Sequence, residues 1–287
     1  MNQDTIVEYK TKHGSATFAF ESDFWIDSID GASSVTINID AVQSVQQTGS
    51  SISGQQVQPK TMVITGEILG DIERNRRRML NIIRPLEPAQ LMVMQDSYTA
   101  IIDGYPSVTP LFNEGNGKQN FQFKFYCPWP YWKLGDVVAT PFKSVFPLFS
   151  FPFNTGGKWF ISKYNESREL NVRNAGTVST GFRVEWTVTS IVTEGVLRLQ
   201  NLTTGEYIRA GLSSDYVSAG NVLELSTVDG DRHFINMTTG KGLYNQLTNF
   251  TALQMRLRPG DNYFKMDNEA LDTKCTIYAP QGVLSGV

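Results

Sequence analysis

No group of residues in the sequence has the types and spacing of a catalytic site. Its only histidines are His13 and His233, which leaves little for a histidine-based metal site or for a nucleophile activated by histidine. His233 follows the segment Asp229-Gly230-Asp231, a strong signal for a β-hairpin turn. These carboxylates could ligate calcium, but the further spaced carboxylates of an EF-hand loop are missing. We therefore expect no metal site, no cofactor and no catalytic residue.

Other constellations give no stronger signal of an enzyme. The segment from Gly115 to Lys118 lacks the spacing of a phosphate-binding P-loop. Paired carboxylates for glycoside hydrolysis remain open, because such pairs are close in space rather than in sequence. Cys127 and Cys275 are too few for a disulfide framework or a zinc site. Both are expected to be small core residues, although one bridge between them is compatible with the sequence. We expect a protein that is not an enzyme.

The composition is that of a globular protein with about two domains. Of its 287 residues, 40% are hydrophobic and 18% are charged, so the chain can bury sizeable cores. The formal net charge of −3 argues against general nucleic-acid binding, which needs a basic face. The N-terminus lacks the features of a signal peptide, and the most apolar run, residues 144–153, is too short to span a bilayer. We expect a soluble protein made in a cytoplasm, with no membrane partner and no specific nucleic-acid partner.

Residues 1–132 are expected to form a β-rich domain with one helix. From Phe121 to Tyr126, phenylalanines alternate with Gln122, Lys124 and Tyr126, which is typical of a half-buried strand. Pro128 and Pro130 prevent further pairing in a central strand, and the aromatic residues up to Trp132 form a plug where the chain leaves the domain. Further strands are predicted at residues 16–20, 35–40, 62–69, 91–94 and 98–103.

The one convincing helix begins after Asp71, a good N-cap, and ends before Pro85. Arg76 falls within the apolar stripe of this helix at about 100° per residue. We therefore expect Arg76 to pair with a carboxylate, either within the domain or across a subunit boundary. The neighbouring arginines project to the opposite side as a solvated face. The stripe consists of Ile72, Met79, Leu80 and Ile83, which recur at helical spacing.

Two segments are unusual for a single compact copy. The tract from Gln43 to Lys60 carries no charged residue before Lys60 itself, and loops of this length are usually functional or mobile. It is either an arm that reaches a neighbouring subunit or a surface loop. Residues 133–160 form a connector rich in phenylalanine and proline. Each fully buried ring contributes about 1.5–3 kcal/mol, so the connector must lie against its own domains or against an adjacent copy. Its candidate contact residues are Phe142, Phe146, Phe149 and Phe151.

Residues 161–287 are expected to form an antiparallel β-sandwich, because about eight short strands follow one another at regular spacing. The segment from Phe182 to Val188 alternates cleanly between apolar and polar side chains. Strands at Val222–Val228 and His233–Met237 flank the hairpin signal noted above.

Taken in order, these features resemble the distal tail (Dit) protein family of long-tailed bacteriophages and related prophage or tailocin particles. The resemblance implies a mainly β protein whose N-terminal belt domain closes into a six-membered ring, with a galectin-like sandwich that projects outward. Some members carry inserted carbohydrate-binding modules, for which the loops here are too short. The matching features are the helix with its Arg-Arg-Arg-Met-Leu run (residues 76–80) and Pro85, Asp103-Gly104-Tyr105-Pro106, the Phe-Tyr-Cys-Pro-Trp-Pro-Tyr-Trp exit (residues 125–132), and the motifs at residues 202–206 and 257–262.

The resemblance also implies a function. It is that of a structural protein of the virion tail tip, assembled in the host cytoplasm. Its homo-hexameric ring would join the tail tube protein to the tail-tip hub protein and carry receptor-binding or adhesin proteins. Two alternatives come from other classes. One is a lectin-like carbohydrate-binding module, with Trp186 or Tyr207 as stacking residues, and the other is a virion-bound hydrolase.

Overall fold

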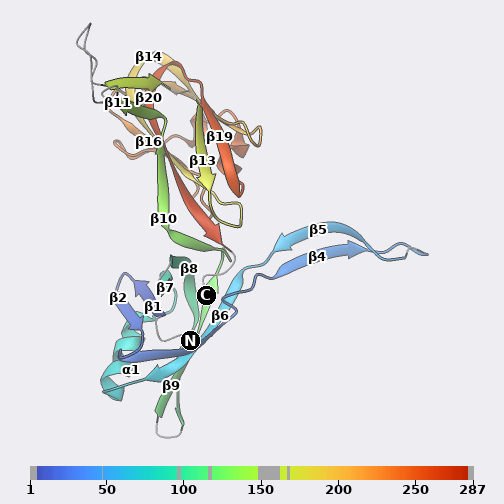
Figure 1. Cartoon of the computed structure of the whole chain (residues 1–287), viewed down its shortest axis with the longest axis vertical. Helices are drawn as coiled ribbons and strands as arrows, with labels where there is room; N and C mark the ends of the chain where they lie inside the picture. The colour runs from blue at the N-terminus through green and yellow to red at the C-terminus, as the bar shows by residue number, and fades with distance from the viewer. Residues whose placement is uncertain are drawn as a thin grey trace, which may run out of the picture. The chain divides into compact units, whose positions relative to one another are not determined.

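The computed structural model describes residues 5–46, 48–95, 98–115, 118–147, 162–166 and 169–283 (Figure 1). The chain divides into unit 1, Met1–Asp136 with Gly282–Val287, and unit 2, Val137–Gln281. The mainly β architecture predicted from the sequence is confirmed, since the described residues are mostly antiparallel strands with one α-helix, α1 (Ile72–Ile82). Among them, no helix reaches the length and apolarity that a membrane crossing requires.

Unit 1 contains two antiparallel sheets that share the long strand β8 (Tyr98–Gly115). This strand pairs with β7 (Ala89–Gln95) as far as Gly104 and with β9 (Lys118–Cys127) from Tyr105 onward. A Cβ atom on Gly104 would collide with the carbonyl oxygen of Tyr126 and the ring of Phe125, so the crossing requires glycine. One sheet has the order β2 (Gly14–Phe18), β1 (Ile6–Thr11), β7 (Ala89–Gln95), β8 and β10 (Trp132–Pro141). The other has the order β3 (Phe24–Asp30), β6 (Lys60–Ile68), β9 (Lys118–Cys127) and β8.

The core of unit 1 is built on the predicted alternating strand, which is β9. Phe121, Phe123 and Phe125 are all buried, and Tyr9 of β1 meets the edges of the last two rings at centroid distances of 5.7 Å. The predicted aromatic plug is only partly correct, because Trp132 is fully buried while Trp129 is 44% exposed. The alternation of the strand therefore identified core residues, whereas the tryptophans that follow it are buried in one case and exposed in the other.

Helix α1 begins where it was predicted, but its buried face is different. The carboxylate Oδ1 of Asp71 accepts a hydrogen bond from the backbone N–H of Arg74 at 3.1 Å, so the predicted N-cap is confirmed. The buried residues of the helix are Asn75, Met79 and Ile82, whereas Ile72 and Leu80 are exposed. The prediction of one apolar stripe was wrong about these two residues. Asn75 is polar yet buried, because its Nδ2 donates to the carbonyl oxygen of Leu69 at 2.8 Å.

The tract predicted as an arm or a loop contains a strand. β5 (Ser51–Val57) pairs with β4 (Ile37–Val42) in a separate two-stranded hairpin. Figure 1 shows the hairpin, in blue, extending away from the other strands of unit 1. Almost every residue of the two strands is exposed. The expectation of a tract without structure of its own was therefore wrong for residues 51–57.

Unit 2 is organised around the long strand β14 (Arg183–Asn201), which takes part in two sheets. The register of β14 against β20 is interrupted between Ile191 and Val196, where the strand passes from one sheet to the other. The predicted hairpin around Gly230 is confirmed as the turn between β16 and β17. The first half of β14 lies between β20 (Glu269–Val283) and β16 (Val222–Ser226), followed by β17 (His233–Asn236) and β18 (Lys241–Gly242). The second half pairs with β15 (Tyr207–Ser213) and β19 (Gly260–Met266), and β19 pairs with β13 (Glu169–Asn174).

The connector starts in unit 1, which includes residues 133–136, and its described part from Val137 onward belongs to unit 2. Phe142 is 2% exposed in the core of this unit, and its backbone N–H donates to the carbonyl oxygen of Cys275 at 2.9 Å. Phe146 lies in β11 (Lys143–Pro147), which pairs with β12 (Ser162–Glu166). Phe149 and Phe151 lie outside the described residues. Cys127 and Cys275 are both buried and free.

Candidate functional site

The β4–β5 hairpin has one apolar face and one polar face. Residues that pair directly across an antiparallel ladder point to the same side, and Ile37 pairs with Val57 while Ala41 pairs with Ile52. Ile39 and its partner Gln55 lie between them on the same side, so this side is mainly apolar. We call the surface formed by Ile37, Ile39, Ala41, Ile52 and Val57 the hairpin face.

No described residue covers the hairpin face. Ile37, Ile39 and Ile52 are each 54–58% exposed. The opposite side is mainly polar: it carries Asn38 and Gln56, which pair with each other, and Asp40, and it ends in the exposed Val42. A two-stranded hairpin on its own is at best marginally stable in water. An amphipathic ribbon of this kind is therefore expected to gain stability when another surface covers its apolar side.

Helix α1 carries a second, exposed apolar line that the sequence pattern had placed in the core. Ile72, Arg76 and Leu80 are four residues apart and therefore lie on the same side of the helix. Ile72 and Leu80 are exposed, and Arg76 is half-buried between them. The guanidinium of Arg76 lies over the ring of Phe112, 4.8 Å from its centroid. We call Ile72, Arg76 and Leu80 the helix ridge. The predicted carboxylate partner of Arg76 stays a prediction.

The neighbouring arginines form ion pairs at the surface of unit 1. Arg77 contacts Glu73 at 3.0 Å one helical turn away, and Arg78 contacts Asp23 at 2.9 Å. Pairs this exposed contribute little to stability. The hairpin face and the helix ridge are thus the two unusual surfaces of the described part of unit 1.

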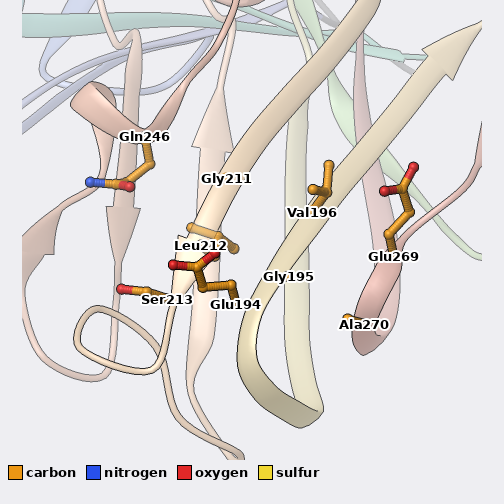
Figure 2. Close-up of a pocket in the computed structure, with 9 residues that line it drawn as sticks. All are labelled: Glu194, Gly195, Val196, Gly211, Leu212, Ser213, Gln246, Glu269 and Ala270. Carbon is orange, nitrogen blue, oxygen red and sulfur yellow. The ribbon is translucent and has the colours of Figure 1, made fainter.

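Unit 2 has a cavity of about 500 Å³ on the solvent side of its second sheet (Figure 2). Its floor is the ladder between β14 and β15, where Val196 pairs with Gly211 and Glu194 pairs with Ser213. Its other lining residues come from the short helix η1 (Tyr244–Gln246) and from the first two residues of β20. No local sequence motif indicated this cavity, because its lining comes from four separate elements. The lining residues are Glu194, Gly195, Val196, Gly211, Leu212, Ser213, Gln246, Glu269 and Ala270.

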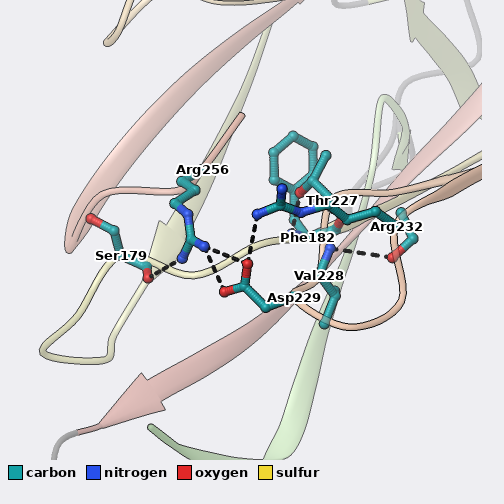
Figure 3. Close-up of polar contacts among 8 residues, drawn as sticks. Ser179, Phe182, Thr227, Val228, Asp229, Arg232 and Arg256 are labelled. Atoms are coloured by element: carbon teal, nitrogen blue, oxygen red, sulfur yellow. Dashed lines mark hydrogen bonds and ion pairs between the residues drawn. The ribbon is translucent and has the colours of Figure 1, made fainter. Parts of the chain in front are cut away.

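The Asp229 carboxylate, considered above as a calcium ligand, is occupied by two arginines (Figure 3). Nη2 of Arg256 donates to both of its oxygens, at 2.5 and 2.6 Å, and Nη2 of Arg232 donates to Oδ1 at 2.7 Å. Nη1 of Arg256 also donates to the carbonyl oxygen of Ser179 at 3.3 Å. These contacts hold the β16–β17 turn against the segment that contains Arg256 and, through Arg256, against the segment that contains Ser179. Within the described ranges, no three histidine, cysteine or acidic side chains are grouped to hold a metal.

The two residues considered for sugar stacking have different environments. Trp186 is fully buried, so it is a core residue and presents no ring to a ligand. Tyr207 is 41% exposed and lies beneath the guanidinium of Arg198, 5.9 Å from the ring centroid.

The chain is similar over nearly its whole length to solved phage tail proteins. One is a crystal structure of the Dit protein of phage SPP1, which is described as a paradigm of the hub adsorption apparatus in phages that infect Gram-positive bacteria. The match has a TM-score of 0.66 and 13% sequence identity, and it covers 97% of this chain and 98% of the SPP1 chain. A chain of the phage P2 baseplate, in its activated conformation with calcium, gives a TM-score of 0.50 at 9% identity and covers 96% of this chain and 97% of its own. The same baseplate in its activated conformation with strontium gives a TM-score of 0.51 at 10% identity. This match covers 96% of this chain and 98% of the baseplate chain.

No protein-family model and no curated protein sequence matches this chain. The fold is nevertheless that of a phage distal tail and baseplate protein. Among the solved structures described above, SPP1 Dit has the highest TM-score. The resemblance drawn from the sequence motifs is thereby confirmed at the level of the fold.

Proposed function

We propose that this protein is a structural component of a phage tail tip, in which six copies form a ring between the tail tube and the tail-tip hub. The fold similarity to SPP1 Dit and to a P2 baseplate chain over nearly the whole chain supports this role. The single observation that carries the ring is the hairpin face, an apolar surface that no described residue of the same chain covers.

The ring forms when the hairpin face of one copy packs on the helix ridge of the next. The hairpin face (the donor surface) and the helix ridge (the acceptor surface) are different surfaces, so the contact is heterologous. Heterologous contacts close into a ring when the rotation from one copy to the next divides a full turn. Fully burying an isoleucine is worth about 1.5–3 kcal/mol. The hairpin residues are already about half buried, so each contributes about 1 kcal/mol of further burial.

The ring acts as a mechanical joint of the virion and not as an enzyme. One face of the ring binds the tail tube protein and the other binds the tail-tip hub protein. Unit 2, a galectin-like sandwich, carries receptor-binding or adhesin proteins. Assembly takes place in the host cytoplasm, before the tail is complete.

The test is the state of assembly of the purified full-length protein. We expect negative-stain images to show an annulus and mass photometry to show six copies. Ile39→Lys puts a charge in the middle of the hairpin face and should leave single copies with an unchanged circular dichroism spectrum. Gln56→Lys puts the same charge on the polar side and should leave the ring intact. A ring that survives Ile39→Lys, or single copies of the wild type at all concentrations, would overturn the proposal.

A further inference from the structure

The cavity of unit 2 is a preformed feature of the fold. Gly195 lies where β14 changes sheets, and a Cβ atom added there would lie 2.8 Å from Cβ of Leu271. Ala270 lies beside Gly195, since its carbonyl oxygen would be 3.2 Å from the same Cβ atom. It has a positive φ of 53°, which is uncommon for a residue with a side chain. By contrast, a Cβ atom added to Gly211 in the floor would meet no atom within 4 Å. The wall at Gly195 and Ala270 is therefore fixed by close packing, whereas the space above Gly211 is open.

The two carboxylates that line the cavity have no oppositely charged partners in the part of the chain that the structure describes. Glu194 and Glu269 line the cavity, and neither carboxylate takes part in an ion pair or a side-chain hydrogen bond with a described residue. Figure 2 shows their carboxylates on separate elements, β14 and β20. Gln246 and Ser213 add further hydrogen-bond acceptors to the lining.

A second charged group lies on the same side of the same ladder. Arg198 pairs directly with Arg209, one same-side step beyond the pair formed by Val196 and Gly211. Like charges directly opposite each other destabilise a sheet. Among the described residues, the only side-chain contact of Arg198 is with the ring of Tyr207, and Arg209 has none. On its other side Arg198 has the acidic residue Asp267 as a neighbour, whose backbone N–H donates to the carbonyl oxygen of Arg198 at 3.0 Å. The neighbours of Arg209 on its other side are Thr248 and Asn249, which are uncharged. An acidic group from outside would therefore mainly offset the charge of Arg209.

We infer that this surface binds an extended segment of a partner protein that carries a basic side chain followed, four residues away, by an acidic one. The basic side chain enters the cavity between Glu194 and Glu269, and the acidic side chain lies on Arg198 and Arg209. Four residues separate the two charged sites along β14, a distance of about 13 Å at about 3.3 Å per residue. In an extended segment, residues i and i+4 point to the same side, so both charged groups can reach the surface together.

The chemistry of the lining favours a guanidinium over a neutral ligand. Arginine presents five N–H donors and no acceptor, and the cavity presents two carboxylates, an amide oxygen and a hydroxyl. The inference takes from the proposed function only that unit 2 contacts other proteins of the particle. Its failure and the failure of the ring can therefore be told apart.

The experiment uses the full-length protein labelled with 15N-glycine and a TROSY NMR titration with the peptide acetyl-Arg-Ser-Gly-Ser-Glu-amide. We expect the amide signals of Gly195 and Gly211 to shift and to reach saturation. Replacing the arginine of the peptide with neutral citrulline, or its glutamate with glutamine, should weaken binding at least fivefold. Shortening the spacing to Arg-Ser-Glu should have a similar effect.

Matched protein variants locate the site. Gly211→Leu fills the open floor and should abolish the shift of Gly195, whereas Gly242→Leu, at another glycine with open space around it, should bind like the wild type. The double variant Glu194→Gln/Glu269→Gln should bind the peptide at least fivefold more weakly. The control Asp272→Asn, which removes a charge from β20 outside the cavity, should change the affinity less than twofold. Unchanged signals from the other glycines will show that each variant is folded.

Three results would overturn the inference. They are equal binding of the citrulline peptide, unchanged binding to Gly211→Leu, and shifts of Gly195 and Gly211 caused by lactose but not by the peptide. The last result would favour a carbohydrate site. Peptide binding by a protein that forms no annulus would refute the ring alone, and a ring that binds no peptide would refute this inference alone.

Discussion

The indole Nε1 of Trp132 donates a hydrogen bond to the carbonyl oxygen of Ala32 at 3.0 Å, across 100 positions of the sequence. Nζ of Lys60 donates to the same oxygen at 2.8 Å. Ala32 follows the end of β3, Lys60 begins β6 and Trp132 begins β10. One carbonyl group therefore fastens three segments at the point where the chain leaves unit 1.

The first prediction concerns this contact. Trp132→Phe keeps an aromatic ring in the core but removes the N–H donor, and we expect it to lower the free energy of unfolding by about 1–2 kcal/mol. Trp129→Phe changes an exposed ring and should alter it by less than about 0.5 kcal/mol. Urea unfolding followed by circular dichroism measures both. Equal effects would mean that the aromatic residues at this exit are interchangeable.

The second prediction concerns alkaline pH and Cys127, which lies directly opposite Lys60 in the ladder. Burial raises the pKa of the Cys127 thiol from 9.0 to about 12, and the nearby Lys60 ammonium offsets only part of this effect. Between pH 9 and 12 the unfolded thiol loses its proton while the folded one keeps it, so stability falls as the pH rises, by at most about 1.4 kcal/mol per unit. The stability difference between the wild type and Cys127→Ala should therefore shrink over this range.

Urea midpoints at pH 8, 9.5 and 10.5 measure that difference. Burial also raises the pKa of the Cys275 thiol well above 9.0, so Cys275→Ala should show the same trend in unit 2. A difference that stays constant or grows with pH would show that the Cys127 thiol does not keep its proton in the folded state.

The third prediction compares two neighbouring arginines of α1. Arg76 is half-buried over the ring of Phe112, whereas the side chain of Arg77 is 77% exposed and pairs with Glu73. Arg76→Ala should lower the free energy of unfolding by about 1 kcal/mol, because it removes a cation–π contact and packed methylene groups. Arg77→Ala should cost at most about 0.5 kcal/mol. Chemical unfolding separates the two, and equal losses would contradict the helical phase that the structure gives.

Much of the fold could be predicted because its signals are local. The alternation from Phe121 to Tyr126 identified a half-buried strand, Asp71 identified the start of α1, and the Asp229–Asp231 segment identified a hairpin. In each case side chains close in the sequence determine the local structure, and the same local structure is present in the folded chain.

The errors arose where a distant contact decides the outcome. Asn75 takes a position in the buried face of α1 because its amide donates to the carbonyl oxygen of Leu69. The apolar residues alone therefore gave a face that is right at Met79 and Ile83 but wrong at Ile72 and Leu80. The polar composition of β5 concealed a strand whose pairing partner is β4. The cavity of unit 2 needs Glu194, Gln246 and Glu269, which only the folded chain brings together.

The last prediction tests whether the ring contact is heterologous. Ile39→Lys disables the hairpin face and leaves the helix ridge, and Leu80→Lys disables the helix ridge and leaves the hairpin face. Neither residue is buried, so both variants should fold, and each alone should remain monomeric by mass photometry. Mixed in equal amounts, they retain one intact donor surface and one intact acceptor surface between them. We expect the mixture to form dimers and to stop there, because the two remaining surfaces of each dimer are disabled. Larger assemblies in the mixture, or no dimers at all, would mean that the hairpin face packs against something other than the helix ridge.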